Sequence, residues 1–354
     1  MRFAFTDDQL ALRDAVRDLL AKECPPEVVR AAWPEGTDDA GARKGEGARA
    51  DAARVAHVWS ALADMGVLGV GVPEDRGGVG LGPLDWVLLA EETGYAALPH
   101  PFVETVCVIA PLLADASDPY GWLPDVIDGT QPVGVDVLEA GVVPWDRPGR
   151  PVVLLRHRGR WDATVAERTA SRRRPAPGAD RAPSVDGGRR LGWVGQWQGV
   201  GRLGDESDAE SAFDRGALGT AAQLVGLGRR MLDLTVAYAI ERKQFGVAIG
   251  SQQAVKHHLA NAAMKLRFAA PAVHAAAWSI ATGTATTSRD VSMAKALASD
   301  AARFTARQAL QCHGAIGYTV EYDLHLYLKR AEALARSWGD AAWHRDRVAA
   351  ALGI

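Results

Sequence analysis

The sequence contains little cysteine, no long apolar run and almost no net charge, and each shortage excludes a class of protein. Its three cysteines, Cys24, Cys107 and Cys312, lack CxxC or other metal-like spacing, which argues against a disulfide framework and against a zinc site. No apolar run reaches the roughly 18 residues that a membrane-spanning helix needs. The 40 lysines and arginines nearly balance the 43 aspartates and glutamates, so no nucleic-acid partner is expected.

The first twenty residues also lack the character of a signal peptide. They carry charged side chains throughout, at Asp7, Asp8, Arg13, Asp14 and Arg17. A secretory signal would instead place a continuous apolar core after a short basic start. We therefore expect a cytoplasmic protein, in a reducing compartment and without membrane attachment.

Helical periodicity dominates both ends of the chain. Thr6 is a good N-cap for a first helix, which Pro25-Pro26 should end. Gly94 is predicted as the C-cap of a later helix, and residues 35–50 are polar and glycine-rich and are predicted to be an exposed loop. From Ala212 to the end the pattern is helical again, with Ala-rich faces that favour a bundle. The further helices are predicted over residues 55–65, 83–93, 103–114, 253–282 and 289–313.

The middle of the chain has a different composition. Short β-branched or alternating runs occur over residues 132–137, 150–156, 161–170 and 189–198, separated by Gly, Pro and Asp turns. The three arginines at 172–174 are predicted to lie in a solvated loop. The sequence therefore predicts a mainly α protein with a small β domain. The expected domains are an N-terminal α-helical domain (1–127), a reduced middle β domain (128–210) and a C-terminal four-helix bundle (211–354).

Two strings of residues carry recognisable chemistry. The first, at residues 241–253, combines Arg242, which can hold a phosphate, with Phe245, which offers a flat apolar face, and with several glutamines. The second, at residues 311–319, closes a long helix with Gly314 and Gly317. These glycines are either helix-end residues or points where the backbone approaches a pyrophosphate.

The order and spacing of these strings resemble the acyl-CoA dehydrogenase family. The matching blocks are AYAIERKQFGVAIGSQQAVKHHLA, SMAKALASDAARFTARQALQCHGAIGYT and EYDLHLYLKRA. An N-terminal block, GVLGVGVPEDRGGVGLGPLDWVLLAEETGY, resembles the helical-domain signature of the same family. The resemblance implies a helical domain, a small β-sheet domain and a four-helix bundle. It also implies FAD as cofactor, α,β-desaturation of acyl-CoA thioesters and an electron-transfer flavoprotein as acceptor.

The resemblance further implies a cofactor site that is shared between subunits. Arg242 and Gln244 would contact the flavin phosphates, and Phe245 would pack beside the nucleotide. In the family these groups reach an FAD that the neighbouring subunit mainly holds, so they form a donated half-site. The residues carried over to this site are Arg242, Gln244, Phe245, Ile249, Gln252, Gln253, Gln311, Gly314 and Ala315.

The sequence departs from the family at the other half of the site. A TEPxxGSD-like segment is missing from residues 132–146, and a flavin-packing tryptophan strand is not recognisable, although Trp161 or Trp193 could occupy a similar place. The usual catalytic glutamate precedes a glycine about twenty residues after the tyrosine of the GYT motif. That position is Trp338 here, and an indole cannot remove a proton.

A second base position known in the family also holds no carboxylate. It falls at Gly216, or one to two turns further on at Gln223. Asp214 is the nearest acid, and a structural role near a helix N-terminus explains it adequately. No catalytic residue is therefore assigned, and Gln223 and Asp214 remain weak alternatives to the Trp338 position.

The departures from the family are selective. The residues that a subunit contributes to its neighbour's flavin are present, whereas the motifs and the base that a subunit needs for its own flavin site are absent. The leading hypothesis is one subunit of an obligate α2β2 acyl-CoA dehydrogenase, whose sister chain supplies the base. Actinobacterial steroid-degrading members of the family resemble this arrangement, which makes steroid side-chain thioesters a substrate class by analogy. The alternatives are a self-sufficient homotetramer with a displaced base and a non-enzymatic scaffold or acyl-CoA-binding relative.

Overall fold

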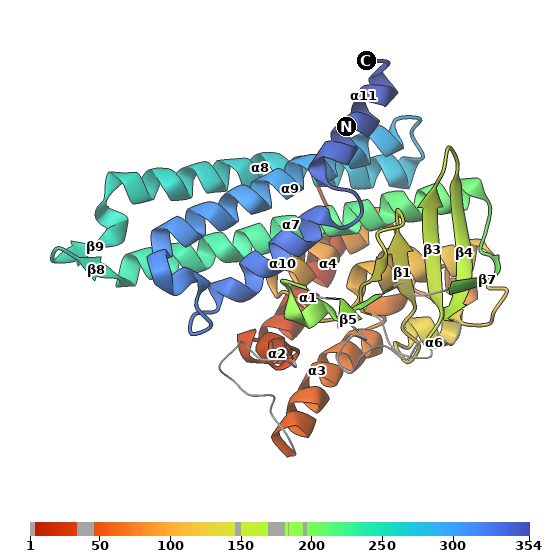
Figure 1. The fold of residues 1–354 in the computed structure, drawn as a ribbon, viewed down its shortest axis with the longest axis horizontal. Coiled ribbons are helices and arrows are strands. Elements are labelled where there is room, and N and C mark those ends of the chain that lie inside the picture. The colour runs from red at the N-terminus through yellow and green to blue at the C-terminus, as the bar shows by residue number, and fades with distance from the viewer. Residues whose placement is uncertain (1–3, 34–45, 146–149, 169–180, 183, 194–196) are drawn as a thin grey trace.

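Two groups of helices flank a small region of β-strands in the computed structural model (Figure 1). Nearly all the apolar core residues of the helices and of the four-stranded sheet belong to one continuous cluster. A second, small cluster lies between the two sheets, around Val143 and Leu154. The structure describes residues 4–33, 46–145, 150–168, 181–182, 184–193 and 197–354.

The first group of helices surrounds a buried helix, α4. Thr6 caps the first helix as predicted, since its hydroxyl accepts the backbone N–H of Gln9 and the Gln9 side chain accepts the N–H of Thr6. The segment before α5 is a π-helix, a form that is rare and concentrated at functional sites. The elements are α1 (Asp7–Glu23), α2 (Pro26–Ala31), α3 (Glu46–Asp64), α4 (Pro83–Tyr95), the π-helix Val103–Ile109, α5 (Ala110–Asp115) and α6 (Leu123–Ile127).

The strands form two small sheets. The larger has the order β1-β3-β4-β7, with β1 and β3 parallel and the other pairs antiparallel, and its strand β4 packs against α7. The smaller has the order β2-β6-β5. The strands are β1 (Gly134–Val137), β2 (Val142–Val143), β3 (Val152–His157), β4 (Trp161–Arg168), β5 (Arg181–Ala182), β6 (Leu191–Trp193) and β7 (Trp197–Arg202).

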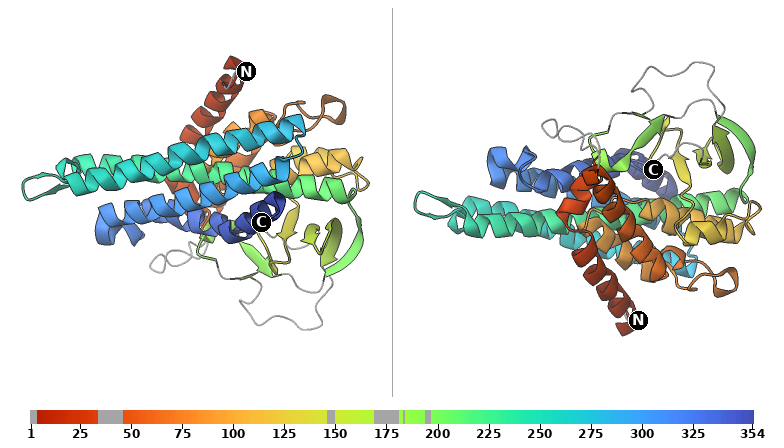
Figure 2. Two further views of the ribbon diagram at one scale, coloured as in Figure 1. Left: turned by 90° about the horizontal axis from the view of Figure 1, so that it is seen from above. Right: turned by 90° about the horizontal axis from the view of Figure 1, so that it is seen from below.

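The second group of helices is a bundle that extends beyond the rest of the molecule. Helices α7, α8 and α9 run alongside one another, and α10 packs on α7 and α9. Figure 2 shows the α7–α8 arm reaching outward to the β8–β9 hairpin. The elements are α7 (Glu206–Glu241), β8 (Lys243–Gln244), β9 (Val247–Ala248), α8 (Gln253–Thr282), α9 (Thr287–His313), α10 (Leu324–Arg336) and α11 (Ala341–Leu352). The predicted mainly α fold with a small β region is confirmed.

Helices α4 and α7 approach each other closely through glycines. An added Cβ at Gly94 would lie 2.2 Å from the backbone oxygen of Gln223, and one at Gly226 would lie 1.9 Å from that of Glu91. The prediction of Gly94 as a C-cap was therefore wrong, because α4 continues through it to Tyr95. A glycine is required there for backbone contact and not for a turn.

Other local predictions need correction for physical reasons. Pro26 begins a new helix at its first turn, where the missing N–H costs nothing, instead of only ending α1. Helix α3 starts at Glu46, so residues 46–50 of the predicted loop are helical. Residues 35–45 lie outside the described residues, as do the three arginines at 172–174. Helix α7 starts at Glu206, where Asp205 caps it through the N–H groups of Ser207 and Asp208.

Candidate functional site

The motif at residues 241–246 forms the outer end of the bundle. Arg242 takes extended backbone angles as the C-cap of α7. Strands β8 and β9 then form an antiparallel hairpin with Phe245 and Gly246 as its two-residue turn, both with positive φ (52° and 82°). The Phe245 side chain is 98% exposed. An aromatic residue in left-handed backbone, presented wholly to solvent, stabilises nothing within its own chain.

The second motif lies at the same end of the bundle. Helix α9 ends at His313, and Gly314 leaves it with a φ of 65°. The His313 ring stacks on Tyr238 at 4.3 Å between centroids, and Tyr238 is one turn before Arg242. The structure therefore brings together the two strings that are far apart in the sequence. An added Cβ at Gly314 would meet no heavy atom within 4 Å in the described chain, so a ligand can approach this backbone.

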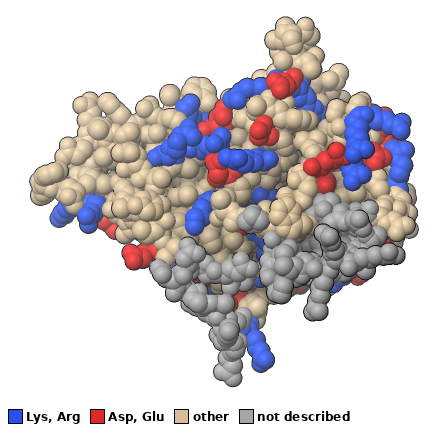
Figure 3. Space-filling model, in the orientation of Figure 1, with Lys and Arg blue, Asp and Glu red and all other residues tan. Residues whose placement is uncertain are grey.

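The residues predicted for cofactor binding form an exposed surface at the outer end of the bundle, here called the ledge. A hydrogen bond between His258 and Gln308 fixes the start of α8 beside the end of α9. On the face that Figure 3 shows, charged side chains gather over the middle of the bundle and the sheet, and the outer bundle is mostly uncharged. Ile249 is half-buried, and the other residues predicted for cofactor binding are exposed: Arg242, Gln244, Phe245, Gln252, Gln253, Gln311, Gly314 and Ala315.

The predicted base position is filled by packing. Trp338 is 4% exposed, and its indole lies on Gly216 of α7, where an added Cβ would be 2.3 Å from the ring. The two positions at which the resemblance places a base are thus in direct contact. Trp338 supplies an indole, and the missing side chain of Gly216 leaves a notch in α7 that the indole fills. Neither residue supplies a carboxylate.

Hydrogen bonds fix the turn that carries Trp338. The ammonium of Lys295, a fully buried residue of α9, donates to the carbonyl oxygens of Gly339 (3.0 Å) and Ala335 (3.3 Å). His344 Nε2 donates to the carbonyl oxygen of Trp338 at 2.8 Å. Burial lowers the pKa of Lys295 to about 7 and that of His344 to about 3. His344 is therefore neutral near pH 7.

Aromatic side chains fill the seam between the sheet and the bundle around this point. Trp161 of β4 packs on Phe213 of α7 at 4.4 Å, and Phe213 in turn contacts Trp343 of α11 at 5.1 Å. The guanidinium of Arg347 lies over all three rings. Trp161 is thus a buried member of this seam, whereas Trp193 is 50% exposed.

The two weak alternatives for the base have structural partners. Gln223 donates to the hydroxyl of Thr93 at 3.1 Å, within the α4–α7 contact. Asp214 accepts from Arg347 at 2.5 Å and from Ser288 at 2.7 Å. Burial raises the pKa of Asp214, while Arg347 opposes that rise. Asp214 is therefore committed to an ion pair that joins α7 to α11.

Sequence reasoning missed two buried charges beside this region. Lys295 falls on the buried stripe of α9 with Val291, Ala298 and Ala302, so a charged residue in an apolar stripe was the available signal. Glu104 of the π-helix is also buried, and burial raises its pKa although Arg189 lies 4.0 Å away. No sequence signal marks that pair, because the two residues meet only in the fold.

Asp323 and Arg330 are both ion-paired within the chain. Asp323 contacts Arg30, and Arg330 contacts the buried Asp186. Arg330 also donates to the carbonyl oxygen of Leu98 at 2.9 Å. These contacts fasten α10 to the N-terminal helices and to the segment before β6.

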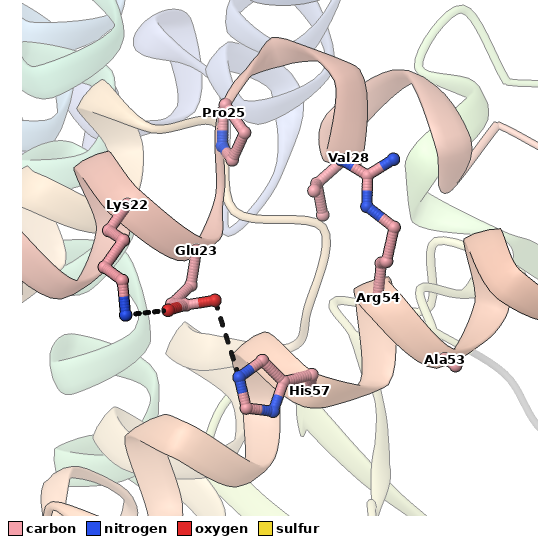
Figure 4. Close-up of a pocket in the computed structure, with 7 residues that line it drawn as sticks. All are labelled: Lys22, Glu23, Pro25, Val28, Ala53, Arg54 and His57. Atoms are coloured by element: carbon pink, nitrogen blue, oxygen red, sulfur yellow. Dashed lines mark ion pairs between the residues drawn. The ribbon is translucent and has the colours of Figure 1, made fainter.

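A separate pocket lies among the N-terminal helices (Figure 4). It has a volume of about 330 Å³ and is bounded by the end of α1, the start of α2 and the middle of α3. Glu23 lies on one side and pairs with Lys22 (2.8 Å) and His57 (3.4 Å). None of the predicted site residues lines this pocket.

The described residues lack two features that would indicate other classes of protein. None of the helices there is long and apolar enough to cross a membrane. No cluster of three or more His, Cys, Asp or Glu side chains in the same part of the chain could hold a metal ion.

Comparison with known proteins decides the family. Residues 6–130 match the acyl-CoA dehydrogenase N-terminal domain, and residues 207–353 match the acyl-CoA dehydrogenase C-terminal domain. This chain belongs to the acyl-CoA dehydrogenase family. Membership places it among oxidoreductases. The two matches leave residues 131–206 between them, the region in which the family's flavin-supporting motif was not found.

Individual family members match along nearly the whole chain. Acyl-CoA dehydrogenase IpdE2 of Mycolicibacterium smegmatis is 31% identical over 94% of this chain and 95% of its own length. Acyl-CoA dehydrogenase FadE34 of Mycobacterium tuberculosis is 32% identical over 98% of this chain, but only 48% of its own length.

Solved structures confirm the acyl-CoA dehydrogenase fold. A chain of the ChsE4-ChsE5 complex from Mycobacterium tuberculosis superposes with a TM-score of 0.78 at 21% identity, covering 100% of this chain and 99% of that one. A chain of a Tcur3481-Tcur3483 steroid ACAD variant gives 0.80 at 21% identity, with 98% of both chains covered.

Proposed function

We propose that this chain is the non-catalytic subunit of an FAD-dependent acyl-CoA dehydrogenase built from two kinds of chain. It donates a half-site for the ADP portion of FAD to a partner subunit, which supplies the base. The observation that carries this proposal is the contrast between two ends of one bundle. The ledge around Phe245 is open, and the base position at Trp338 is packed shut.

The open ledge fits the nucleotide of a cofactor that is held mostly by another chain. Arg242 offers a guanidinium for a phosphate, Gln244 and Gln311 offer amides, and Gly314 allows close backbone approach. FAD, when bound, would accept the hydride from the β carbon of the acyl group. The exposure of these residues in the single chain agrees with a site that two subunits complete together.

The reaction also needs a group that removes the α proton, and this chain offers none at the expected place. Trp338 has no basic atom, and Gly216 has no side chain. His344, which donates its Nε2 hydrogen to the carbonyl oxygen of Trp338, has a pKa of about 3. General-base catalysis requires a group whose pKa lies near the operating pH, so His344 is unsuited.

The relatives support the kind of partner that we propose. Two structural neighbours are hetero-complexes by name, ChsE4-ChsE5 and Tcur3481-Tcur3483. They support an α2β2 assembly with a sister acyl-CoA dehydrogenase subunit. The second is named a steroid ACAD, which supports a steroid-derived acyl-CoA thioester as substrate. An electron-transfer flavoprotein is the proposed acceptor, as is usual in the family.

Flavin content tests this proposal against its two rivals. The chain is purified alone and again after coexpression with sister acyl-CoA dehydrogenase chains, and FAD is measured by absorbance. We expect no flavin and no turnover from the chain alone, and one FAD for each pair of chains in the complex. Full flavin occupancy with turnover by the isolated chain would favour a self-sufficient homotetramer. A complex without flavin would favour a scaffold.

A further inference from the structure

The turn that carries the Trp338 indole is held in an unusual backbone conformation by neighbouring side chains. Its backbone φ is 58°, in the left-handed region that bulky residues rarely adopt, and Gly339 follows with a φ of 81°. Such a conformation persists only where the surroundings hold it. Lys295 from α9 and His344 from α11 hold the backbone oxygens of these two residues, so a clamp is present on each side of the turn.

The bundle has a notch that matches the indole. Three ring atoms of Trp338 lie within 2.6 Å of the place where a Cβ at Gly216 would be, so every other amino acid at position 216 would displace the ring. The indole closes this notch almost completely, because Trp338 is only 4% exposed. Phe213, one turn earlier on α7, lies beside it at 6.1 Å between ring centroids.

From this geometry, and resting on the proposed function, we propose that Trp338 seals the chain's own reaction chamber. The indole occupies the space that an acyl group would enter, and Gly216 is the notch that admits it. The subunit therefore takes up no acyl thioester of its own, even within the complex. The exclusion of an acyl group is therefore steric, and it adds to the absence of a carboxylate.

The two buried cations that bond to the turn around Trp338 both have partners within the chain. Lys295 is turned toward the carbonyl oxygens of Gly339 and Ala335 and toward the hydroxyl of Ser299. Arg189, on the sheet side, donates to the hydroxyl of Ser337 at 2.9 Å. Both cations therefore support the turn around Trp338.

Opening the notch tests the seal. In the complex, Trp338→Gly removes the indole and also suits the left-handed backbone, so the turn itself is expected to survive. The probe is hexanoyl-N-acetylcysteamine, an acyl thioester without a nucleotide, and the bound amount per complex is measured by equilibrium dialysis. We expect the variant to bind twice as many thioester equivalents as the wild type, because both kinds of chain then accept one.

A control variant distinguishes a specific effect of opening the Trp338 site from the general effect of removing a buried tryptophan. Trp86→Gly removes another buried indole, in α4, and should leave the wild-type thioester count unchanged. A folded, assembled Trp338→Gly complex with the wild-type count would overturn the proposal. If that variant does not assemble, Trp338→Leu removes less volume and decides by the same count. Flavin content is measured on the wild-type complex in the same series, and a wild-type complex without FAD would contradict the proposed function and not the seal.

Discussion

The Nζ atom of Lys295 lies 3.0 Å from the carbonyl oxygen of Gly339, and no part of the Lys295 side chain reaches solvent. The ammonium also donates to the carbonyl oxygen of Ala335, near the C-terminal end of α10, where the helix dipole favours a cation. Burial opposes that charge and lowers the pKa of Lys295 from 10.5 to about 7. The residue that clamps the Trp338 turn is therefore also a titrating group.

Replacing Lys295 by methionine should change how stability depends on pH. The unfolded chain keeps a proton on Lys295 up to about pH 10.5, whereas the folded chain releases it near pH 7. Between these values the unfolded state binds more protons, so the wild type gains stability relative to Lys295→Met as pH rises, by at most about 1.4 kcal/mol per pH unit. Urea unfolding of both proteins from about pH 6 to 9 measures this difference. A difference that stays constant above pH 7 would contradict the lowered pKa.

A methyl group at Gly216 should be costly, because it would enter the Trp338 ring. We expect Gly216→Ala to lower the free energy of unfolding by about 2–4 kcal/mol, the range of severe overpacking in a core. Gly71→Ala is the control, since its added Cβ would lie no closer than 3.6 Å to any neighbour, and it should change stability by less than about 0.5 kcal/mol. Chemical denaturation of the three proteins provides the comparison.

The cost of the Gly216 methyl should disappear when the indole is absent. In a Trp338→Ala background, Gly216→Ala should cost less than about 1 kcal/mol, because the added methyl then occupies emptied space and favours the helix. A double-mutant cycle isolates the coupling between the two positions. Additive effects would mean that the indole moves aside in the Gly216→Ala protein.

Much of the fold could be predicted from local patterns. Helix α8 has the predicted bounds, Gln253–Thr282, since an uninterrupted 3.6-residue period ends at Gly283, a left-handed C-cap. A strand was predicted from the β-branched run over residues 150–156, and β3 spans Val152–His157. The π-helix Val103–Ile109 could not be distinguished from an α-helix, because its i+5 bonds have no sequence signature and tertiary packing decides between them.

The candidate site was predictable in its residues but not in its contacts. The sequence identified Trp338 and Gly216 separately, each as a place where a base is missing. That the two residues fill one volume depends on how α7 and the α10–α11 turn are packed, which no local pattern contains. The same holds for Gly94, whose role comes from the backbone of Gln223, more than a hundred residues away.

Phe245 should matter to the complex and not to the isolated chain. Its side chain is 98% exposed with a φ of 52°, so Phe245→Asn removes no core contact and suits the left-handed backbone better. We expect the isolated variant to be as stable as the wild type, or more stable by up to about 1 kcal/mol. In the complex, the variant should retain less FAD during gel filtration. A stability loss in the isolated chain would instead show that Phe245 packs within its own subunit.

Substitution of Arg242 should separate the binding of FAD by this chain from catalysis by the complex. In the complex, Arg242→Ala should raise the dissociation constant for FAD about tenfold or more, since a bidentate guanidinium–phosphate contact contributes about 1.5–3 kcal/mol. The rate of turnover at saturating FAD should stay near the wild-type value, because the proposed function assigns the base to the partner subunit. Lys243→Ala, which removes a neighbouring exposed cation from the same hairpin, serves as the control and should leave FAD affinity within about twofold. Equal losses in the two variants would mean that the hairpin attracts FAD by charge alone, without a specific contact from Arg242.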